Sequence, residues 1–387
     1  MPYECDICEK SFKQKSHLTA HKNRKTPCKK NTHIEALVEK KVKEALEKVK
    51  NIVVSIQSPK IQQSTQSTQS TQSTQSTQQS LVNSVKPFLK WVGGKTQILD
   101  SVLERFPRDM IHYHEPFLGG GSVLLGVLSQ KQEGRIRISG TVYASDVNPL
   151  LISLYTNIQT HVDDFIRETK TLVDTYTSIK GTVVNRKPTT EDEAKTSQES
   201  YYYWIRSQLN GMTKDMKQTI KGSAHFLFLN KTCFRGVYRE GPNGFNVPFG
   251  NYKNPGILDE AHIRTVSTLI QDVVFTAQSF QESLKRVSSG DFVYLDPPYA
   301  PESDTSFVSY VADGFDGKKH KALFDTCQSL PKQGVKFLMS NADVSLVKTA
   351  FPSPAFQTQS ITCRRAIHSK TPDAKAKEVL IQSSVIE

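Results

Sequence analysis

The segment Tyr294–Tyr299 (YLDPPY) brings together three groups that could act on a planar amine. Asp296 supplies a carboxylate and Pro297 a peptide carbonyl, and together they can accept both N–H groups of an amine such as that of adenine. Because the lone pair of this amine is delocalised into the ring, holding its hydrogens draws the nitrogen toward sp3 geometry and makes it a nucleophile. Tyr299 offers a ring on which a base turned out of its duplex could stack. The segment therefore predicts a site that activates an amino group, with Asp296, Pro297 and Tyr299 as its catalytic residues.

A run of three glycines, Gly119–Gly121, follows a predicted strand and indicates a second kind of site. Without side chains, the backbone at the carboxyl end of a parallel strand can approach a nucleotide-type ligand closely. The next predicted strand ends at Asp146, where a carboxylate can accept hydrogen bonds from ribose hydroxyls. No Lys-Ser/Thr pair follows the glycines, which argues against a nucleoside triphosphatase. Dinucleotide enzymes share the remaining pattern, so the YLDPPY segment decides which donor is expected.

The segments that position these residues alternate between strand-like and helix-like patterns from Lys86 onward, which is typical of an α/β sheet. Between about 155 and 274 the pattern turns helical, aromatic and basic, and this predicts an inserted domain. Strands are predicted at His112–Glu115, Thr141–Ser145, Phe292–Leu295, Val335–Ser340 and Val379–Ile381.

The chain from Lys86 onward resembles the Dam-type DNA adenine methyltransferases of the D12 class. The resemblance rests on the motifs FLKWVGGK, EPFLGGGSV, ASDVN, LNKTCFRGVYR, FNVPFGNYKNP, YLDPPYAP, MSNAD and CRRAI, which occur in this order. It implies a Rossmann-like methyltransferase sheet with a helical target-recognition domain inserted into it. It also implies site-specific transfer of a methyl group from S-adenosylmethionine to the N6 atom of a flipped adenine in double-stranded DNA.

The same resemblance implies the residues of the methyl-donor pocket. For Trp91 and Phe117, ordinary core packing is the alternative interpretation. The expected cofactor-binding residues are Trp91, Lys95, Glu115, Phe117, Gly119, Gly120, Asp146, Phe280 and Asp296.

The stretch Leu229 to Pro255 resembles the DNA-reading β-hairpin of this family and its supporting loop. The resemblance implies that Lys90 contacts the first guanine of GATC, that Val237 touches the thymine methyl and that Arg239 reads the guanine opposite the last cytosine. Arginine is the commonest reader of guanine, and an aliphatic side chain suits a thymine methyl, so side-chain chemistry agrees. The expected DNA-binding residues are Lys90, Phe234, Arg235, Val237, Arg239, Pro248, Tyr252, Arg364 and Arg365.

Two positions depart from the family pattern. Dam-type enzymes often have Asn where Arg235 stands and Leu where Val237 stands, so the expected site is GATC or a close variant. Arg235 is expected either to enter the duplex with Phe234 or to contact a phosphate. Tyr252, Arg364 and Arg365 are interpreted as contacts to the DNA backbone, or else as part of a solvated basic face.

The N-terminal residues match a two-cysteine, two-histidine zinc finger up to its first histidine. Two thiolates and one imidazole are suitable ligands for tetrahedral zinc. The second histidine is absent, and Cys28 is the nearest replacement, with His17 as the alternative. A ββα finger is therefore predicted, with zinc bound by Cys5, Cys8, His21 and Cys28.

Composition changes along the chain indicate separate parts. The pattern after the finger predicts one helix, either a short coiled coil capable of weak self-association through residues 34–56 or a solitary amphipathic helix. The STQ repeat that follows has nothing to bury, so a disordered linker is expected. The expected domains are a finger at 1–32, a helix at 33–58, a linker at 59–85, a catalytic domain at 86–155 and 270–387, and a target-recognition domain at 156–269.

A formal charge of +12 and a pI near 9.2 suit a polyanionic partner such as DNA. The N-terminus lacks the apolar core of a secretory signal, so an intracellular protein that is neither secreted nor bound to a membrane is expected. The sequence does not indicate whether a restriction endonuclease acts with it.

Two other functions fit part of the pattern. Related Asp/Asn-Pro-Pro-Tyr loops act on other planar amines, so methylation of RNA or of a protein glutamine is an alternative, which the FNVPFG stretch disfavours. The chain could also be an inactive DNA-binding regulator, but none of its catalytic motifs is broken.

Overall fold

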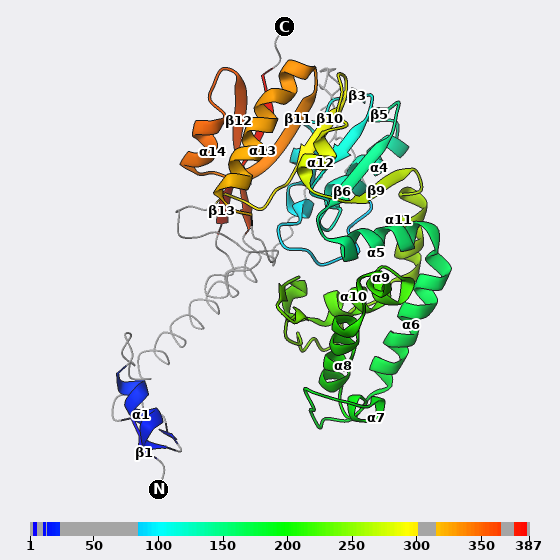
Figure 1. The fold of residues 1–387 in the computed structure, drawn as a ribbon, viewed down its shortest axis with the longest axis vertical. Coiled ribbons are helices and arrows are strands. Elements are labelled where there is room, and N and C mark those ends of the chain that lie inside the picture. Colours follow the sequence, from blue (N-terminus) through cyan, green and yellow to red (C-terminus); the bar gives the residue numbers. More distant parts are fainter. Residues whose placement is uncertain are drawn as a thin grey trace, which may run out of the picture. The chain divides into compact units, whose positions relative to one another are not determined.

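The computed structural model describes residues 3–5, 11–12, 14–23, 84–300, 315–364 and 375–384. The chain divides into two compact units, Met1–Gln78 and Gln79–Glu387 (Figure 1). The predicted helix at 33–58 and the predicted linker up to residue 83 lie outside the described residues.

The N-terminal unit contains two short strands and a helix. Strands β1 (Tyr3–Glu4) and β2 (Ser11–Phe12) pair antiparallel, and helix α1 spans Lys15–Lys22. The ring of Phe12 lies 4.9 Å from that of the buried His21, measured between centroids. The order of these elements is that of the predicted ββα motif.

The larger unit is built on a seven-stranded sheet with the order β12-β13-β11-β10-β4-β6-β9. The five strands from β11 to β9 in this order run parallel, whereas β13 pairs antiparallel with β11 and β12 pairs antiparallel with β13. The strands are β4 (Tyr113–Glu115), β6 (Val142–Asp146), β9 (Val273–Ala277), β10 (Phe292–Leu295), β11 (Lys336–Ala342), β12 (Phe356–Arg364) and β13 (Lys375–Ser383).

All five predicted strands are present, but both edge strands of the sheet were missed. β12 reads FQTQSITCR, and β9 reads VVFTA with a largely exposed or half-buried pattern. Edge strands bury fewer side chains than central strands, and β12 accordingly lacks the apolar run that marks β10. β9 has a short apolar run, but only its first residue, Val273, is buried.

Both faces of the sheet are covered. Phe292 and Tyr294 of β10 face one hydrophobic cluster, while Val293 and Leu295 face the other, as the two-residue period of a strand requires. The first cluster includes helices α3 (Leu99–Leu103), α4 (Ser122–Gln132) and α5 (Pro149–Thr160). The second includes α12 (Phe280–Leu284), α13 (Gly317–Ser329) and α14 (Ser345–Ala350). The larger unit is therefore a three-layer α/β structure.

Helices dominate between β6 and β9, in agreement with the predicted pattern (Figure 1). α5 begins at Pro149 because the side chain of Asn148 accepts hydrogen bonds from the amides of Leu150 and Leu151. α10 packs against α5, α6 and α8. The other helices here are α6 (Val162–Ser178), α7 (Glu191–Ala194), α8 (Gln198–Gly211), α9 (Lys214–Lys217), α10 (Ile220–Thr232) and α11 (Glu260–Leu269).

Short elements complete the unit: 3-10 turns η1 (Lys95–Gln97), η2 (Phe234–Gly236) and η3 (Leu330–Gln333), and strands β3 (Asp109–Met110), β5 (Arg137–Ile138), β7 (Glu240–Gly241) and β8 (Gly244–Phe245). None of the described helices combines the length and the hydrophobicity that crossing a membrane requires.

Candidate active site

Three predicted carboxylates lie along the carboxyl edge of the parallel strands. Glu115 ends β4, Asp146 ends β6, and Asp296 directly follows β10. Because β10, β4 and β6 are parallel neighbours in the sheet, their carboxyl ends meet at one edge. This edge is where ligands bind in open α/β sheets.

Lys95 and Asp296 form an ion pair that joins two motifs distant in the sequence. The Nζ of Lys95 lies 2.7 Å from Oδ2 of Asp296, and it also donates to the carbonyl of Gly93 at 2.7 Å. Only 3% of the Lys95 side chain and 20% of the Asp296 side chain are exposed. Ser122 accepts a hydrogen bond from the Lys95 amide at 3.0 Å, which anchors η1 to the start of α4. Burial raises the pKa of Asp296, and the charge of Lys95 opposes that rise.

Glu115 is the most deeply buried of the three carboxyl groups. It is 2% exposed, and the hydroxyl of Tyr113 donates a hydrogen bond to its Oε2 at 2.7 Å. Burial raises the pKa of Glu115 to about 8, and the nearby charge of Asp296 contributes to the rise. Burial therefore favours the protonated form of Glu115 more than it is favoured in an exposed glutamate.

Asp146 is tied to the glycine turn. Its Oδ2 accepts from the Gly119 amide at 3.1 Å and its Oδ1 from the Asn148 amide at 3.0 Å. Gly119 has a φ of +49°, in the left-handed region that glycine adopts without strain. Burial raises the pKa of the Asp146 carboxyl, and these two amide hydrogen bonds counteract the rise.

Trp91 fills the space beside the glycine turn. A Cβ on Gly119 would lie 2.9 Å from Nε1 of Trp91, and one on Gly120 would lie 2.7 Å from Cβ of Trp91. The indole also stacks on Tyr238, with centroids 5.9 Å apart and ring planes 20° apart. The missing side chains of these glycines therefore admit Trp91, and a role for Trp91, Gly119 and Gly120 at a bound ligand stays a prediction.

Phe117 and Phe280, which were each predicted to lie at the donor pocket, stack on one another with ring centroids 5.6 Å apart. Phe280 is 3% exposed and belongs to the second hydrophobic cluster, against which the half-buried Phe117 packs. A role for either ring at a bound ligand stays a prediction.

The YLDPPY segment is fixed by residues from the two strands beyond β10. The hydroxyl of Tyr299 donates to Oε2 of Glu378 at 2.9 Å, and the amide of Ala300 donates to Oδ1 of Asn341 at 3.0 Å. Pro297 is buried, and the Nζ of Lys95 lies 5.0 Å from the centroid of the Tyr299 ring.

Sequence reasoning assigned no role to Glu378, Asn341 or Tyr113. Asn341 lies in the MSNAD motif, which was noted only as part of the resemblance. Glu378 reaches the site because β13 returns antiparallel to β11 and places Glu378 opposite Ala342. No local sequence signal marks this register.

Lys90 lies beside the predicted DNA-reading segment, although they are far apart in the sequence. Its amide donates to Oδ1 of Asn230 at 3.0 Å, and its Nζ donates to the carbonyl of Lys231 at 3.3 Å. The same Nζ lies 3.9 Å from the centroid of the Tyr252 ring. Burial lowers the pKa of Lys90.

The turn η2 presents two predicted DNA-binding side chains to solvent. Phe234 is 49% exposed, and its amide donates to the carbonyl of Pro248 at 2.9 Å. Arg235 has a φ of +57°, and its amide donates to the hydroxyl of Tyr252 at 2.8 Å. A left-handed backbone is strained for arginine and points to a turn that its surroundings hold firmly.

The exposed Arg239 precedes the hairpin of β7 and β8. Its Nε donates to Oδ1 of Asn246 at 2.6 Å, which fixes the direction of the guanidinium group. Val237 is half-buried against the core. Arg364 ends β12, but its side chain and all of Arg365 lie outside the description.

Two of the four predicted zinc ligands are described. Cys5 is 1% exposed and His21 is 9% exposed, while Cys8 and Cys28 lie outside the described residues. Among the residues described, no group of three or more His, Cys, Asp or Glu side chains could hold a metal ion.

Comparison with known proteins decides the family. The family model of the D12 class N6 adenine-specific DNA methyltransferases matches residues 91–367, which is more than half of the chain. The chain belongs to this family. The matched span contains Asp296, Lys95 and the whole predicted DNA-reading segment. A second model, for zinc fingers of the C2H2 type, matches residues 3–24 and so includes Cys5, Cys8 and His21.

Relatives of this D12-class chain include methyltransferases of bacteria and archaea. The type II methyltransferase M.MjaIII of Methanocaldococcus jannaschii is 36% identical over 74% of this chain and 94% of its own length. The DNA adenine methylase of Haemophilus influenzae is 30% identical over 77% of this chain and 94% of its own length. Among solved structures, TrmN from Thermus thermophilus matches 75% of this chain and 48% of its own chain, with a TM-score of 0.29 and 10% sequence identity. This likeness is too low to define the fold.

Proposed function

We propose that this chain transfers a methyl group from S-adenosylmethionine to the exocyclic amino nitrogen of an adenine flipped out of duplex DNA, within GATC or a close variant. The observation that carries the proposal is the placement of Asp296 at the carboxyl edge, beside Pro297 and Tyr299 and paired with Lys95. Membership of the D12 class supports the reaction, and the family resemblance supports the sequence.

Asp296 and the carbonyl of Pro297 would accept the two N–H groups of the amine, and Tyr299 would stack on the base. The charge of Lys95 opposes the rise in the pKa of Asp296 that burial causes, and so favours the ionised carboxylate. A protonated Asp296 would itself donate a hydrogen bond. The ionised form, which the ion pair favours, can instead accept a hydrogen bond from the adenine amine. An incoming amine must share Asp296 with Lys95 or displace it.

The residues at the carboxyl edge suit a cationic methyl donor. S-adenosylmethionine supplies an electrophilic methyl group on a positively charged sulfur. Asp146 and Asp296 place carboxyl groups along this edge, and Asp146 stands where a ribose would be held. A cationic sulfur near Glu115 would favour the ionised form of that residue. The residues proposed to hold the donor are Trp91, Lys95, Glu115, Phe117, Gly119, Gly120, Asp146 and Phe280.

Activity against a panel of duplexes tests the proposed sequence. Wild-type protein with labelled donor should methylate a duplex that contains one GATC and should lose most of this activity when any one of the four bases is changed. Equal labelling of all duplexes would reject GATC and its close variants.

Replacing Lys95 with Gln should shift the pH dependence of methylation. Without the lysine charge, the pKa of Asp296 rises further. The carboxylate is then lost at higher pH, so the acid limb of kcat/KM should move up by about one pH unit. Lys285→Gln is a suitable control, because Lys285 is exposed and paired with Glu282 on α12. An acid limb that stays in place would remove Lys95 from this role.

Replacing Glu378 with Ala should lower kcat about tenfold, because the ring of Tyr299 would lose the contact that fixes its hydroxyl. Glu378→Gln keeps an acceptor oxygen and should retain activity within about threefold. Tyr299→Phe should lower kcat at least as much, because it also removes an interaction with Asp296. The double variant should be no worse than Tyr299→Phe, since Glu378→Ala removes a hydrogen bond that Tyr299→Phe has already removed. Additive losses in the double variant would show that Glu378 acts through another contact.

We further propose that residues 1–32 bind one zinc ion through Cys5, Cys8, His21 and Cys28. The match to the C2H2 model and the burial of Cys5 and His21 support the first three ligands. Metal analysis of the full chain should find one zinc ion, and Cys28→Ala should weaken its retention against a chelator. Unchanged retention in that variant would exclude Cys28 and favour His17.

A further inference from the structure

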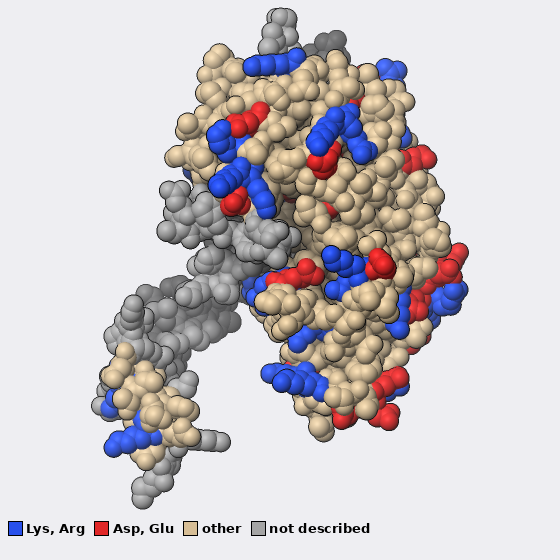
Figure 2. All heavy atoms as spheres, viewed as in Figure 1, with Lys and Arg blue, Asp and Glu red and all other residues tan. Residues whose placement is uncertain are grey.

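We propose that Arg186 and Lys187 bind phosphates of the DNA that flanks the recognition sequence. The inference rests on the proposed function, in which duplex DNA is the substrate. Both residues lie in the loop between α6 and α7, on the helical part of the larger unit, and both are exposed. Figure 2 shows Lys and Arg side chains on the helical part of the face in view as well as on the sheet part.

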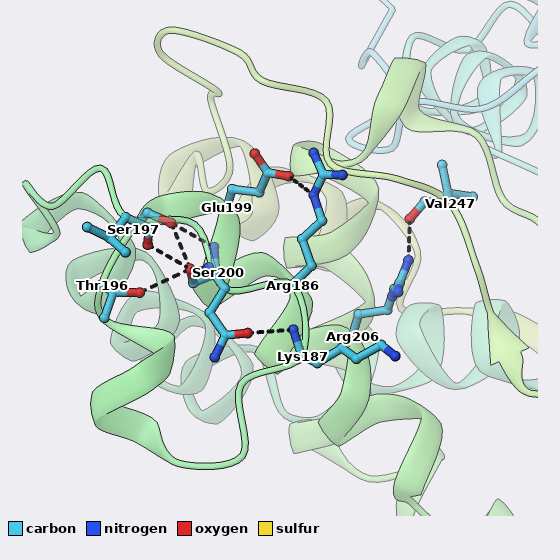
Figure 3. Close-up of polar contacts among 10 residues, drawn as sticks. Arg186, Lys187, Thr196, Ser197, Glu199, Ser200, Arg206 and Val247 are labelled. Atoms are coloured by element: carbon cyan, nitrogen blue, oxygen red, sulfur yellow. Dashed lines mark hydrogen bonds and ion pairs between the residues drawn. The ribbon is translucent and has the colours of Figure 1, made fainter. Parts of the chain in front are cut away.

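Side chains at the start of α8 hold this loop in place. The amide of Asn185 donates to Oγ of Ser200 at 2.8 Å, and Oδ1 of Asn185 accepts from the Lys187 amide at 2.9 Å. Ser200 is buried and also bonds to the hydroxyls of Thr196 and Ser197 (Figure 3). The two basic residues therefore stand on an ordered support, which reduces the entropy lost when they bind a ligand.

Arg186 is anchored in a way that suits phosphate binding. Its Nε donates to Oε1 of Glu199 at 2.7 Å, while 69% of its side chain remains exposed. Its guanidinium carbon lies 6.0 Å from the ring centroid of Tyr203, and that of Arg206 lies 4.6 Å from the same ring. A guanidinium oriented through Nε can still present its terminal nitrogens to an anion, and arginine binds phosphate through such paired contacts.

Arg206, which shares the Tyr203 ring with Arg186, also contacts the predicted DNA-reading segment. Arg206 donates through Nη1 to the carbonyl of Val247 at 3.2 Å, and Tyr202 donates to that carbonyl at 2.7 Å. The next residue, Pro248, accepts the amide of Phe234 at 2.9 Å. Figure 3 shows Arg206 extending to Val247 and Arg186 extending to Glu199. DNA held by Phe234 and its neighbours would therefore meet this basic loop if the duplex extended past the recognition sequence.

Glu199 offsets part of this charge by pairing with Nε of Arg186, whereas Glu191 and Glu193 make contacts of their own. Glu191 of α7 pairs with Lys195 at 2.7 Å, and Glu193 accepts the amide and hydroxyl of Thr189. Each phosphate contact releases counterions, so it makes affinity depend on salt with a slope of about 0.9 per contact. Loss of the phosphate contacts of both Arg186 and Lys187 should therefore reduce the salt dependence of DNA affinity by a measurable amount.

The test compares the full-length double variant Arg186→Ala/Lys187→Ala with wild type on two duplexes that carry the same central GATC. One has about 12 base pairs and the other about 30, and affinity is measured across a range of salt. On the long duplex the variant should bind about tenfold more weakly at low salt, and its salt slope should be smaller by about two. On the short duplex the two proteins should bind alike. At saturating DNA, kcat and the preference for GATC should be unchanged.

Two further variants serve as controls. Arg135→Ala/Lys336→Ala removes an arginine paired with Glu133 and an exposed lysine at the start of β11, so it should leave both affinities unchanged. Arg186→Lys/Lys187→Arg keeps the charges and should keep the long-duplex slope. If the alanine variant fails to fold, Arg186→Gln/Lys187→Gln removes the same charges with less change of side-chain size and should show the same loss of slope.

An unchanged slope on the long duplex would overturn the inference. An equal loss on the short duplex would also overturn it, because the contact would then lie within the recognition sequence. Failure of wild-type protein to methylate any DNA would instead reject the proposed function itself. Wild-type methylation with no effect of the double variant would reject only the flanking contact.

Discussion

Replacement of Asp296 with Ala should lower the rate of methyl transfer at least about a hundredfold, because the main task of this carboxylate is to hold and polarise the target amine. Loss of one positioned acceptor costs on the order of 3 kcal/mol of transition-state stabilisation. The variant leaves Lys95 without its partner carboxylate, although Lys95 still donates to the carbonyl of Gly93. Affinity for the donor should therefore stay within a few-fold of wild type.

Single-turnover rates and donor binding, measured on the same preparations, check this expectation. Asp272→Ala is a matched control, since Asp272 is exposed just before β9 and should be dispensable. Turnover of Asp296→Ala within tenfold of wild type would exclude Asp296 from the mechanism. A large loss of donor affinity with normal chemistry would assign it to the donor pocket alone.

Replacement of Arg239 with Ala should relax the choice of the last base pair of GATC. A bidentate contact from arginine to guanine contributes about 1–3 kcal/mol of discrimination. Asn246 holds Nε of Arg239 at 2.6 Å, so the guanidinium is already oriented before DNA binds. The variant should therefore methylate GAT followed by other bases, while wild type should not.

Rates on the four duplexes that differ only at this base pair measure the effect. Arg364→Ala is the useful comparison, because loss of a phosphate contact should weaken binding to every duplex about equally. An Arg239→Ala enzyme that remains as selective as wild type at the fourth position would reject the assignment.

The centre of the fold was predictable because its strands are buried on both faces. The apolar run Phe292–Leu295 was expected as a strand with the bounds that β10 has. The edge strand β12 was missed because its exposed positions carry polar residues that resemble a loop, and β9 was missed although it is short and mostly apolar. The helical content between β6 and β9 was expected from its pattern, while the proposed domain boundaries stay predictions.

The site was predictable where its residues lie in contiguous motifs. Asp296 and Lys95 came from separate motifs and do meet at 2.7 Å. Glu378 could not be found, because its contact with Tyr299 depends on the register of β13 against β11. The contact of Trp91 with Gly119 could not be predicted either, because no sequence feature indicates that the indole packs against this glycine.

The central claim is that the methyl group goes to the N6 atom of adenine, and identification of the modified nucleoside tests it most directly. Wild-type protein and Asp296→Ala would be incubated with duplex DNA and isotopically labelled S-adenosylmethionine, and the DNA would then be digested and analysed by mass spectrometry. The account predicts labelled N6-methyldeoxyadenosine with wild type and almost none with the variant. Label on cytosine, or no label in DNA treated with a folded wild-type protein, would contradict it.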